Sequence, residues 1–136
     1  MRYRSEVGIV FKKSEEKLFF EKMNEWDAIN SKDNEYDSAR ALLEDAEYRV
    51  VHSDSLNEDC VVIFWASIKW HHIYNSVEFF TKVQDKIDMD FVRVGEGYDD
   101  IEEKLNLKSD ILSYYTKMYL VIDSELAGSY VVLHKS

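Results

Sequence analysis

Hydrophobic and polar positions recur along the chain with periods that divide it into short strands and helices. The longest uninterrupted apolar run, Val61 to Trp65, is hydrophobic at every position. Successive side chains of a strand point to opposite faces, so this run predicts a central strand that is covered on both sides. A helix is predicted after it, with its cap at Asn75 or Ser76, because apolar residues recur three or four positions apart at Val77, Phe80, Val83 and Ile87. The segment 60–87 is therefore expected to form the centre of the fold.

The residues before this centre predict two more strands and two helices. Alternation over 6–13 predicts a first strand, and the next helix is expected to be capped by Ser14, with Trp26 and Ile29 on its apolar face. A polar loop over 30–37 ends at Ser38, which is expected to cap a short helix over 39–46. A strand over 48–53 and a turn over 54–59 predict a hairpin with the central strand.

The residues after the centre predict a short strand over 91–94 that ends at Gly95 and Gly97. The acidic run that follows, with Asp99 and Asp100, suits the first turn of a helix over 98–107. Two final strands over 118–122 and 129–134 are expected to pair as a hairpin.

This order of elements predicts one α+β domain spanning residues 1–136. The expected architecture is an antiparallel sheet with two main helices on one face, in the split βαβ order of ferredoxin-like folds, plus a C-terminal β-hairpin. That hairpin could extend the sheet or fold across its other face. The second apolar face of the central strand needs a cover, either from the hairpin or from a second copy of the chain.

Composition agrees with a folded domain in a reducing compartment. Hydrophobic residues make up 46% of the 136 residues, which excludes a disordered chain. The single cysteine, Cys60, cannot form an internal disulfide, and no leader-like amino-terminal segment is present, so a cytoplasmic location is expected. No apolar run approaches the roughly 20 residues that cross a bilayer.

Negative charge is concentrated in one part of the chain. The formal net charge is −10, and residues 24–59 alone hold 11 acidic and 3 basic side chains. Such a chain is expected to be repelled by nucleic acid and by anionic membranes. Its charged partners are expected to be proteins with basic surfaces, including proteins that themselves bind nucleic acid.

Two arrangements of histidines are candidate sites of chemistry. His71 and His72 are adjacent, so on a strand they would point to opposite faces and could not share a metal, and no other His or Cys has zinc-ligand spacing. Cys60 and His52 lie on neighbouring predicted strands and could pair as a thiolate and its base, but no third group orients them. The preferred interpretations are that His71 and His72 mark the end of a strand and that Cys60 is a buried thiol of the core. No metal or cofactor is expected.

The segment RVGEGYDD is the most distinctive loop of the sequence. Its glycines allow a sharp turn, and its charged residues Arg93, Glu96, Asp99 and Asp100 could contact a ligand or a hard cation. The spacing matches neither a calcium loop nor a phosphate-binding loop. The structural alternative is a tight turn in which Arg93 pairs with Glu96 or Asp99.

Aromatic residues are more numerous than a small core requires. Trp65, Trp70 and Tyr74 are candidates for an interface, because Trp and Tyr are enriched at the centres of protein interfaces. Self-association as a homodimer is one outcome, and packing in the core is the alternative.

Together these observations favour a non-enzymatic, acidic protein-binding module. Its candidate partner-binding carboxylates are Asp33, Glu35, Asp37, Glu44, Asp45, Glu47, Asp54, Glu58 and Asp59. In size and charge alone the chain resembles small phage inhibitors of restriction or CRISPR enzymes, which imitate the phosphate charge of DNA. A solvated surface that only maintains solubility is the simpler interpretation of the same carboxylates. The rival function is a small enzyme or ligand-binding domain with a cleft beside the 93–100 loop, using Arg93 for an anion and Glu96 or Asp99 as a base.

Overall fold

The computed structural model describes residues 3–97 and 99–112, and they form an α+β fold built on one antiparallel sheet. The strands are β1 (Ser5–Lys12), β2 (Glu47–Ser53), β3 (Glu58–Ile68), β4 (Met89–Val94) and β5 (Ile101–Leu105). Their order across the sheet is β2-β3-β1-β4-β5, so β2 and β5 are its outer strands. The prediction of an antiparallel α+β fold is confirmed.

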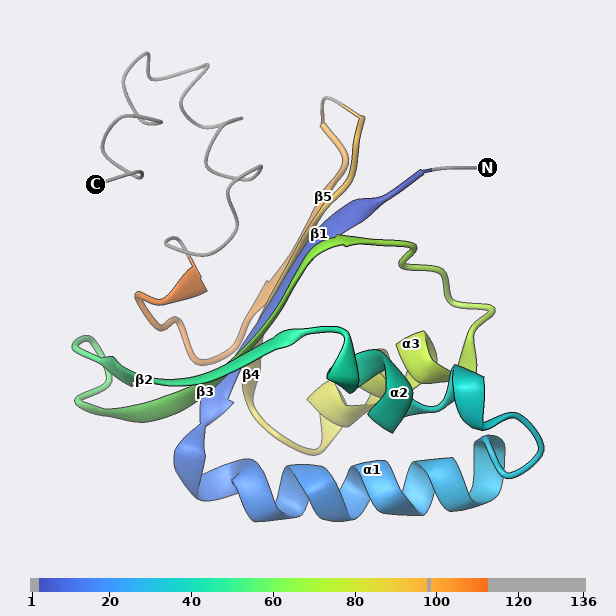
Figure 1. The fold of residues 1–136 in the computed structure, drawn as a ribbon. Coiled ribbons are helices and arrows are strands. Elements are labelled where there is room, and N and C mark those ends of the chain that lie inside the picture. Colours follow the sequence, from blue (N-terminus) through green and yellow to red (C-terminus); the bar gives the residue numbers. More distant parts are fainter. Residues whose placement is uncertain (1–2, 98, 113–136) are drawn as a thin grey trace.

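Three helices lie on one face of this sheet (Figure 1). They are α1 (Glu16–Asn30), α2 (Ala39–Glu44) and α3 (Asn75–Lys82). Single 3₁₀ turns precede α1 at Lys13–Glu15, precede α2 at Glu35–Asp37, and follow α3 at Val83–Asp85. The main helical layer therefore follows the apolar periods of the sequence.

The larger core fills the space between the helices and the sheet. Phe19 of α1 is fully buried, and its ring stacks on Phe11 of β1 with 4.7 Å between centroids. The same ring meets Phe79 and Phe80 of α3 at 5.7 and 6.1 Å. Aromatic contacts at these separations stabilise a core beyond the burial of their area. Phe19 is thus the point where both main helices and the central strand of the sheet meet.

A smaller core lies on the opposite face of the sheet. Val10, Val62, Val92 and Val94 are buried there together with Cys60, and Ile111 and Leu112 pack against them. Figure 1 shows the segment that follows β5 crossing to this side, away from the helices. β3 is therefore apolar on both faces, as the unbroken hydrophobic run Val61 to Trp65 predicts, although β1 and not β3 is the middle strand of the sheet. The predicted strands over 118–122 and 129–134 lie outside the described residues.

The start of each main helix differs from the prediction. Ser14 does not cap α1, because the chain first forms a 3₁₀ turn and α1 then begins without a side-chain cap. Neither Asn75 nor Ser76 caps α3. Its first N–H groups are instead accepted by Asp37, whose carboxylate bonds to the amides of Asn75 at 3.0 Å and Ser76 at 3.2 Å. The cap of α2 by Ser38 is confirmed, with its hydroxyl 3.0 Å from the amide of Ala41.

The predicted helix over 98–107 is wrong, because this segment forms β5 and pairs antiparallel with β4. Asp99 and Asp100 lie in the turn between these strands rather than in a first helical turn. Arg93 lies directly opposite Glu102 in the pairing, and the two side chains form an ion pair. Cross-strand attraction of this kind supports a strand where local composition alone suits a helix.

Ile29 does not lie on the buried face of α1, as the apolar pattern predicts, because its side chain is 75% exposed.

Candidate functional site

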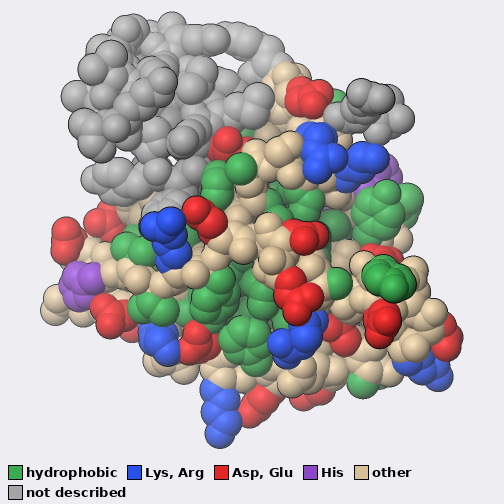
Figure 2. All heavy atoms as spheres, in the orientation of Figure 1, with side chains coloured by type: hydrophobic (Ala, Val, Ile, Leu, Met, Phe, Trp, Pro, Cys, Tyr) green, Lys and Arg blue, Asp and Glu red, His purple; other side chains and the backbone are tan. Residues whose placement is uncertain are grey.

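The predicted acidic residues fall in three places. Asp33 and Glu35 lie in the connection from α1 to α2, while Glu44, Asp45 and Glu47 lie at the end of α2 and the start of β2. The remaining group is at the β2–β3 turn, at the opposite end of the molecule in Figure 1: Asp54, Glu58 and Asp59. In Figure 2, acidic side chains alternate with basic and hydrophobic ones over the visible face. The 24–59 segment therefore does not place its charge in one continuous stripe on that face.

Several of these carboxylates are already engaged within the chain. Glu58 pairs with Lys12 at 3.3 Å, and Asp59 contacts His52 at 3.0 Å. Glu47 pairs with Arg49 at 3.3 Å, and Asp37 is half-buried as the cap of α3. Among the described residues, no ion pair involves the other carboxylates of the first two groups: Asp33, Glu35, Glu44 and Asp45. Within these first two groups, these four carboxylates are therefore available to a partner.

Of two separate grooves, one of about 440 Å³ and a larger one of about 520 Å³, the larger adjoins the connection between α1 and α2, residues 31–38, which we call the acidic loop. This larger groove, of about 520 Å³, runs between α2, the start of α3 and the end of β3. Tyr36 and Tyr74 line it, and they are 89% and 39% exposed. Ile73, next to Tyr74 in the chain, is 74% exposed. We call this feature, lined by Tyr36, Asp45 and Tyr74, the acidic-aromatic groove.

Hydrogen bonds between distant segments fix the walls of this groove. The Asp37 carboxylate also accepts the Ser76 hydroxyl at 2.7 Å, which ties the acidic loop to α3. The Trp26 indole donates to the carbonyl of Asn75 at 3.0 Å, and the Asn75 side chain donates to the carbonyl of Asn30 at 2.8 Å. The groove is therefore held by α1, the acidic loop and α3 together.

The three candidate interface aromatics have different environments. Trp65 is only 3% exposed, and its indole donates to the carbonyl of Leu42 at 2.9 Å, so it belongs to the core. Trp70 is partly buried, with its ring 6.0 Å from Phe91. Tyr74 alone lies at the acidic-aromatic groove.

The 93–100 loop closes on itself through charged hydrogen bonds. The Arg93 guanidinium bonds to Asp100 at 2.6 Å, pairs with Glu102, and donates to the Ser5 hydroxyl at 3.0 Å. The hydrogen bond from Arg93 lowers the pKa of Asp100 below its usual range, and a hydrogen bond from Tyr3 acts in the same direction. Arg93 thus pairs with Asp100 and Glu102, rather than with Glu96 or Asp99 as expected, and its cation is already neutralised.

Glu96 and Asp99, the candidate bases of this loop, are both exposed. Glu96 accepts the backbone N–H of Arg4 at 3.2 Å. Neither residue lines the pocket beside the β4–β5 hairpin. The structure therefore does not bring them together with Arg93 around a cavity.

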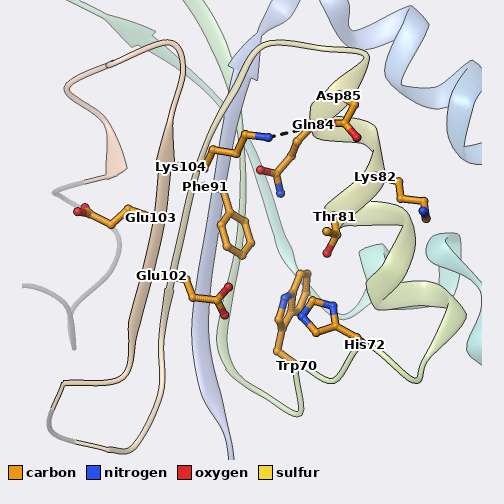
Figure 3. A pocket seen from close by; sticks show the side chains of 10 residues that line it. All are labelled: Trp70, His72, Thr81, Lys82, Gln84, Asp85, Phe91, Glu102, Glu103 and Lys104. Atoms are coloured by element: carbon orange, nitrogen blue, oxygen red, sulfur yellow. Dashed lines mark ion pairs between the residues drawn. The ribbon is translucent and has the colours of Figure 1, made fainter.

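That adjoining pocket lies between α3 and the outer strand β5 and has a volume of about 440 Å³ (Figure 3). Glu102 and Lys104 point into it from β5, Phe91 forms its base, and Trp70 and His72 lie at one end. Glu103 points to the other side of the strand, as alternation requires. Lys104 pairs with Asp85 across the pocket at 3.8 Å.

The polar groups of this pocket are mostly bound to protein atoms. Glu102 pairs with Arg93, and the Gln84 amide donates to the carbonyl of Phe80 at 2.9 Å. Thr81 hydrogen-bonds the carbonyl of Val77 at 3.5 Å, so no base activates its hydroxyl. The pocket can hold a small polar molecule, but its described side chains offer no activated nucleophile.

The histidines and the cysteine do not assemble into a site. His71 and His72 are exposed in the turn after β3, and His52 lies on the opposite face of the sheet from Cys60. Residues 3–97 and 99–112 contain no group of three or more His, Cys, Asp or Glu placed to hold a metal. Cys60 is buried and lies on the other face of the sheet from His52, so the two residues cannot act as a paired nucleophile and base.

Burial raises the pKa of the Cys60 thiol to about 11. We therefore expect Ellman's reagent to label the folded protein at about pH 8 at least ~100-fold more slowly than the denatured protein, because the thiolate is the reactive form. Because burial raises this pKa above its ordinary value of 9.0, the contribution of the protonated thiol to the free energy of unfolding should be fully present below about pH 9 and be lost as the pH rises towards 11. Equal labelling rates in the two states would show that the thiol is accessible.

Sequence reasoning missed Tyr36, which lines the groove, and Ile73, which is exposed next to Tyr74 in the chain. Both occur in segments without hydrophobic period, Tyr36 within NSKDNEYD and Ile73 within HHIY. An apolar residue that belongs to no periodic face has no predicted place in the core. That isolation is the signal that could have identified them.

Comparison with models of protein families, with curated proteins and with solved structures found no match to this chain. Within the described residues, no helix combines the length and the apolar character needed to cross a bilayer.

Proposed function

We propose that this protein is a non-enzymatic binding module whose acidic-aromatic groove docks onto a basic surface of another protein. The observation that carries the proposal is that Tyr36 and Tyr74 remain exposed around one groove, with Ile73 exposed next to Tyr74 in the chain. Exposed aromatic side chains with a polar border are the usual composition of a binding surface. Fixed walls reduce the ordering cost of binding at such a site.

Charge gives the expected chemistry of the partner. Asp45 lines the groove, and Asp33, Glu35 and Glu44 are chain neighbours of lining residues. The basic residues that line the groove are Arg4 and Lys69. The formal net charge of −10 adds long-range attraction to any basic partner and speeds its association.

A nucleic-acid-handling protein is a fitting partner, since its binding surface is basic. We propose that the module occupies such a surface as an inhibitor, in the manner of phage proteins that imitate DNA. The division of the carboxylates between two ends of the molecule limits this mimicry to the groove end. Direct binding to nucleic acid or to a membrane is disfavoured by the same charge.

We further propose that the fold belongs to the ferredoxin-like class. The neighbour relations β2-β3-β1-β4, with α1 between β1 and β2 and α3 between β3 and β4, support this assignment. The outer strand β5 is then an addition beside β4. Fold class alone does not identify a function.

The proposal is tested by a comparative pull-down from lysate of the source cells. A groove variant, Tyr36→Ser with Tyr74→Ser, should lose a captured protein that the wild type retains. The control variant Asp54→Asn with Asp59→Asn changes one residue of the distant β2–β3 turn and one at the start of β3, and it should retain the protein. Recovery of the same proteins in the same amounts by all three forms would contradict the proposal.

Once that protein is purified, charge neutralisation gives a quantitative test. Changing Asp33, Glu35, Glu44 and Asp45 to their amides should weaken binding at least about tenfold at low ionic strength, because close charge pairs across interfaces contribute about 1.5 kcal/mol or more. Isothermal titration calorimetry measures the change. An affinity that does not fall would exclude a charge-based contact at this surface.

A ligand-binding function for the pocket of Figure 3 is the second candidate. Its volume of about 440 Å³ is in the range of small-molecule sites. A metabolite that raises the melting temperature of the wild type but not of Lys104→Ala would support it. The control is Lys17→Ala, which removes an exposed lysine of α1 far from this pocket in the chain.

A further inference from the structure

A second groove, between α1 and the end of α3, differs in character from the rest of this acidic molecule. Its volume is about 360 Å³, and its apolar side chains are Trp26, Ile29, Phe79 and Val83. Phe79 and Val83 are 2% and 3% exposed and form its base, whereas Ile29 is 75% exposed at its edge. We call it the α1–α3 groove.

The border of the α1–α3 groove is basic. Lys22, Lys82 and Lys86 line it together with one acidic residue, Glu25. Lys22 and Lys82 are partly neutralised, by Glu25 at 3.5 Å and by Glu78 at 3.6 Å. Among the described residues, no ion pair involves Lys86. A molecule with a net charge of −10 thus has a local basic rim around an apolar groove.

The chain itself contains a segment with the complementary chemistry. Tyr36 is the most exposed large hydrophobic residue described, at 89%, and it stands between the exposed carboxylates Asp33 and Glu35 and the capping Asp37. An aromatic side chain flanked by carboxylates matches an apolar groove flanked by lysines. The 3₁₀ turn Glu35–Asp37 and the bonds from Asp37 to α3 hold this loop in place, so it is already ordered for binding.

We propose that two copies of the chain associate, with the Tyr36 loop of each copy bound in the α1–α3 groove of the other. The loop follows directly from the carboxyl end of α1, and Ile29 lies one residue before that end. In a two-fold dimer each contact occurs twice, so the loop and the groove can exchange reciprocally around Ile29. This arrangement accounts for the exposure of both Ile29 and Tyr36 in the single chain.

The expected dimer is weak, because two copies with a net charge of −10 repel one another. At about 0.15 M salt the screening length is about 8 Å, so distant repulsion is reduced while direct Lys–Glu contacts persist. The Tyr36 loop also borders the acidic-aromatic groove, so a basic partner would compete with dimer formation. Dimer formation is nevertheless measured on the purified protein without any partner. A failure to dimerise would therefore not contradict the proposed docking function.

Charge reversal at the two surfaces tests the proposal. Analytical ultracentrifugation over a series of protein concentrations measures the dimer dissociation constant of each variant. Lys86→Glu and Glu35→Lys should each raise the dimer dissociation constant about tenfold, since each change places like charges together at two symmetric contacts. The double variant should restore the wild-type value, because each new glutamate then faces a new lysine. It also has the wild-type net charge.

The single variants separate local contact from overall repulsion. Glu35→Lys lowers the net negative charge, so overall repulsion alone would make it dimerise better, whereas the proposed contact requires that it dimerise worse. Lys17→Glu, with the same net charge as Lys86→Glu but outside the groove, should dimerise better than Lys86→Glu. A circular dichroism melt confirms that every variant is folded.

Three results would overturn the proposal. The first is a wild type that stays monomeric up to about 100 μM, well above the micromolar range of weak specific dimers. The second is a dimer whose dissociation constant neither single reversal changes. The third is a double variant whose dissociation constant is no lower than those of the single variants. A dimer that is weakened by each reversal and restored by the pair supports it.

Discussion

Replacing Asp90 by alanine is expected to lower the free energy of unfolding by about 3 kcal/mol or more. The Asp90 side chain is buried at 1% exposure, and its carboxylate accepts the backbone N–H groups of Leu107 and Lys108 at 2.8 Å and of Ser109 at 2.7 Å. These three donors belong to the reversal that carries the chain from β5 to the second face of the sheet. Alanine would leave them without their acceptor in a partly buried place, and the cost of unsatisfied donors exceeds the net value of the bonds themselves.

Urea denaturation of the wild type and the variant measures this difference. Asp88→Ala is the matched control, because Asp88 is exposed two residues earlier and its loss should change the free energy of unfolding by less than about 0.5 kcal/mol. Asp90→Asn should lie between the two, since an amide oxygen still accepts hydrogen bonds but the amide nitrogen cannot. Equal stability of the Asp88 and Asp90 variants would show that the reversal is held by other contacts.

Phe19→Ala is expected to cost about 4 kcal/mol, within the range for aromatic residues removed from a core. Phe19 is fully buried and contacts rings from β1, α1 and α3, including Phe11 at 4.7 Å and Phe20 at 5.4 Å. Truncation would open a cavity at the meeting point of three elements, none of which can move inward without losing its other contacts. The loss therefore combines the transfer of the ring to water with the cost of the cavity.

Phe20→Ala provides the comparison for this variant. Phe20 is its neighbour in α1, only partly buried, with its ring 6.1 Å from Tyr48 and 5.8 Å below the Arg40 guanidinium. Its truncation should cost about 1–2 kcal/mol, because the exposed side of the ring is already in water. If both variants lost the same stability in urea denaturation, the core would not be centred on Phe19.

Elements with a strong hydrophobic period were predictable from the sequence. The apolar run in β3 and the recurrence of Val77 and Phe80 in α3 predicted the correct elements and buried positions. The predicted helix is too long, because α3 ends at Lys82 and the buried Val83 lies in the 3₁₀ turn that follows. β5 was not predictable in this way, because Glu102, Glu103 and Lys104 follow one another without apolar alternation, and the partner of Glu102, Arg93, lies in another strand. Local pattern cannot reveal a pairing that depends on the register between segments.

The candidate site was predictable in composition but not in arrangement. Residues 24–59 are acidic in any fold, yet the structure engages Asp37 and Glu58 internally and leaves Asp33 and Glu35 without ion pairs among the described residues. Which carboxylates are free depends on neighbours that are distant in sequence: α3 for Asp37 and β1 for Glu58. The α1–α3 groove likewise joins two helices that no short motif connects.

The two outer strands of the sheet also affect how the protein behaves at high concentration. β5 exposes three charged side chains in succession, Glu102, Glu103 and Lys104, and in β2 each valine has a polar or charged neighbour, Arg49 or His52. A foreign strand that paired with either edge would have to bring its own side chains against these charges, and such edges resist the growth of cross-molecular sheets. Crowded solutions of the protein should therefore stay free of fibrils even where weak, reversible contacts between copies form.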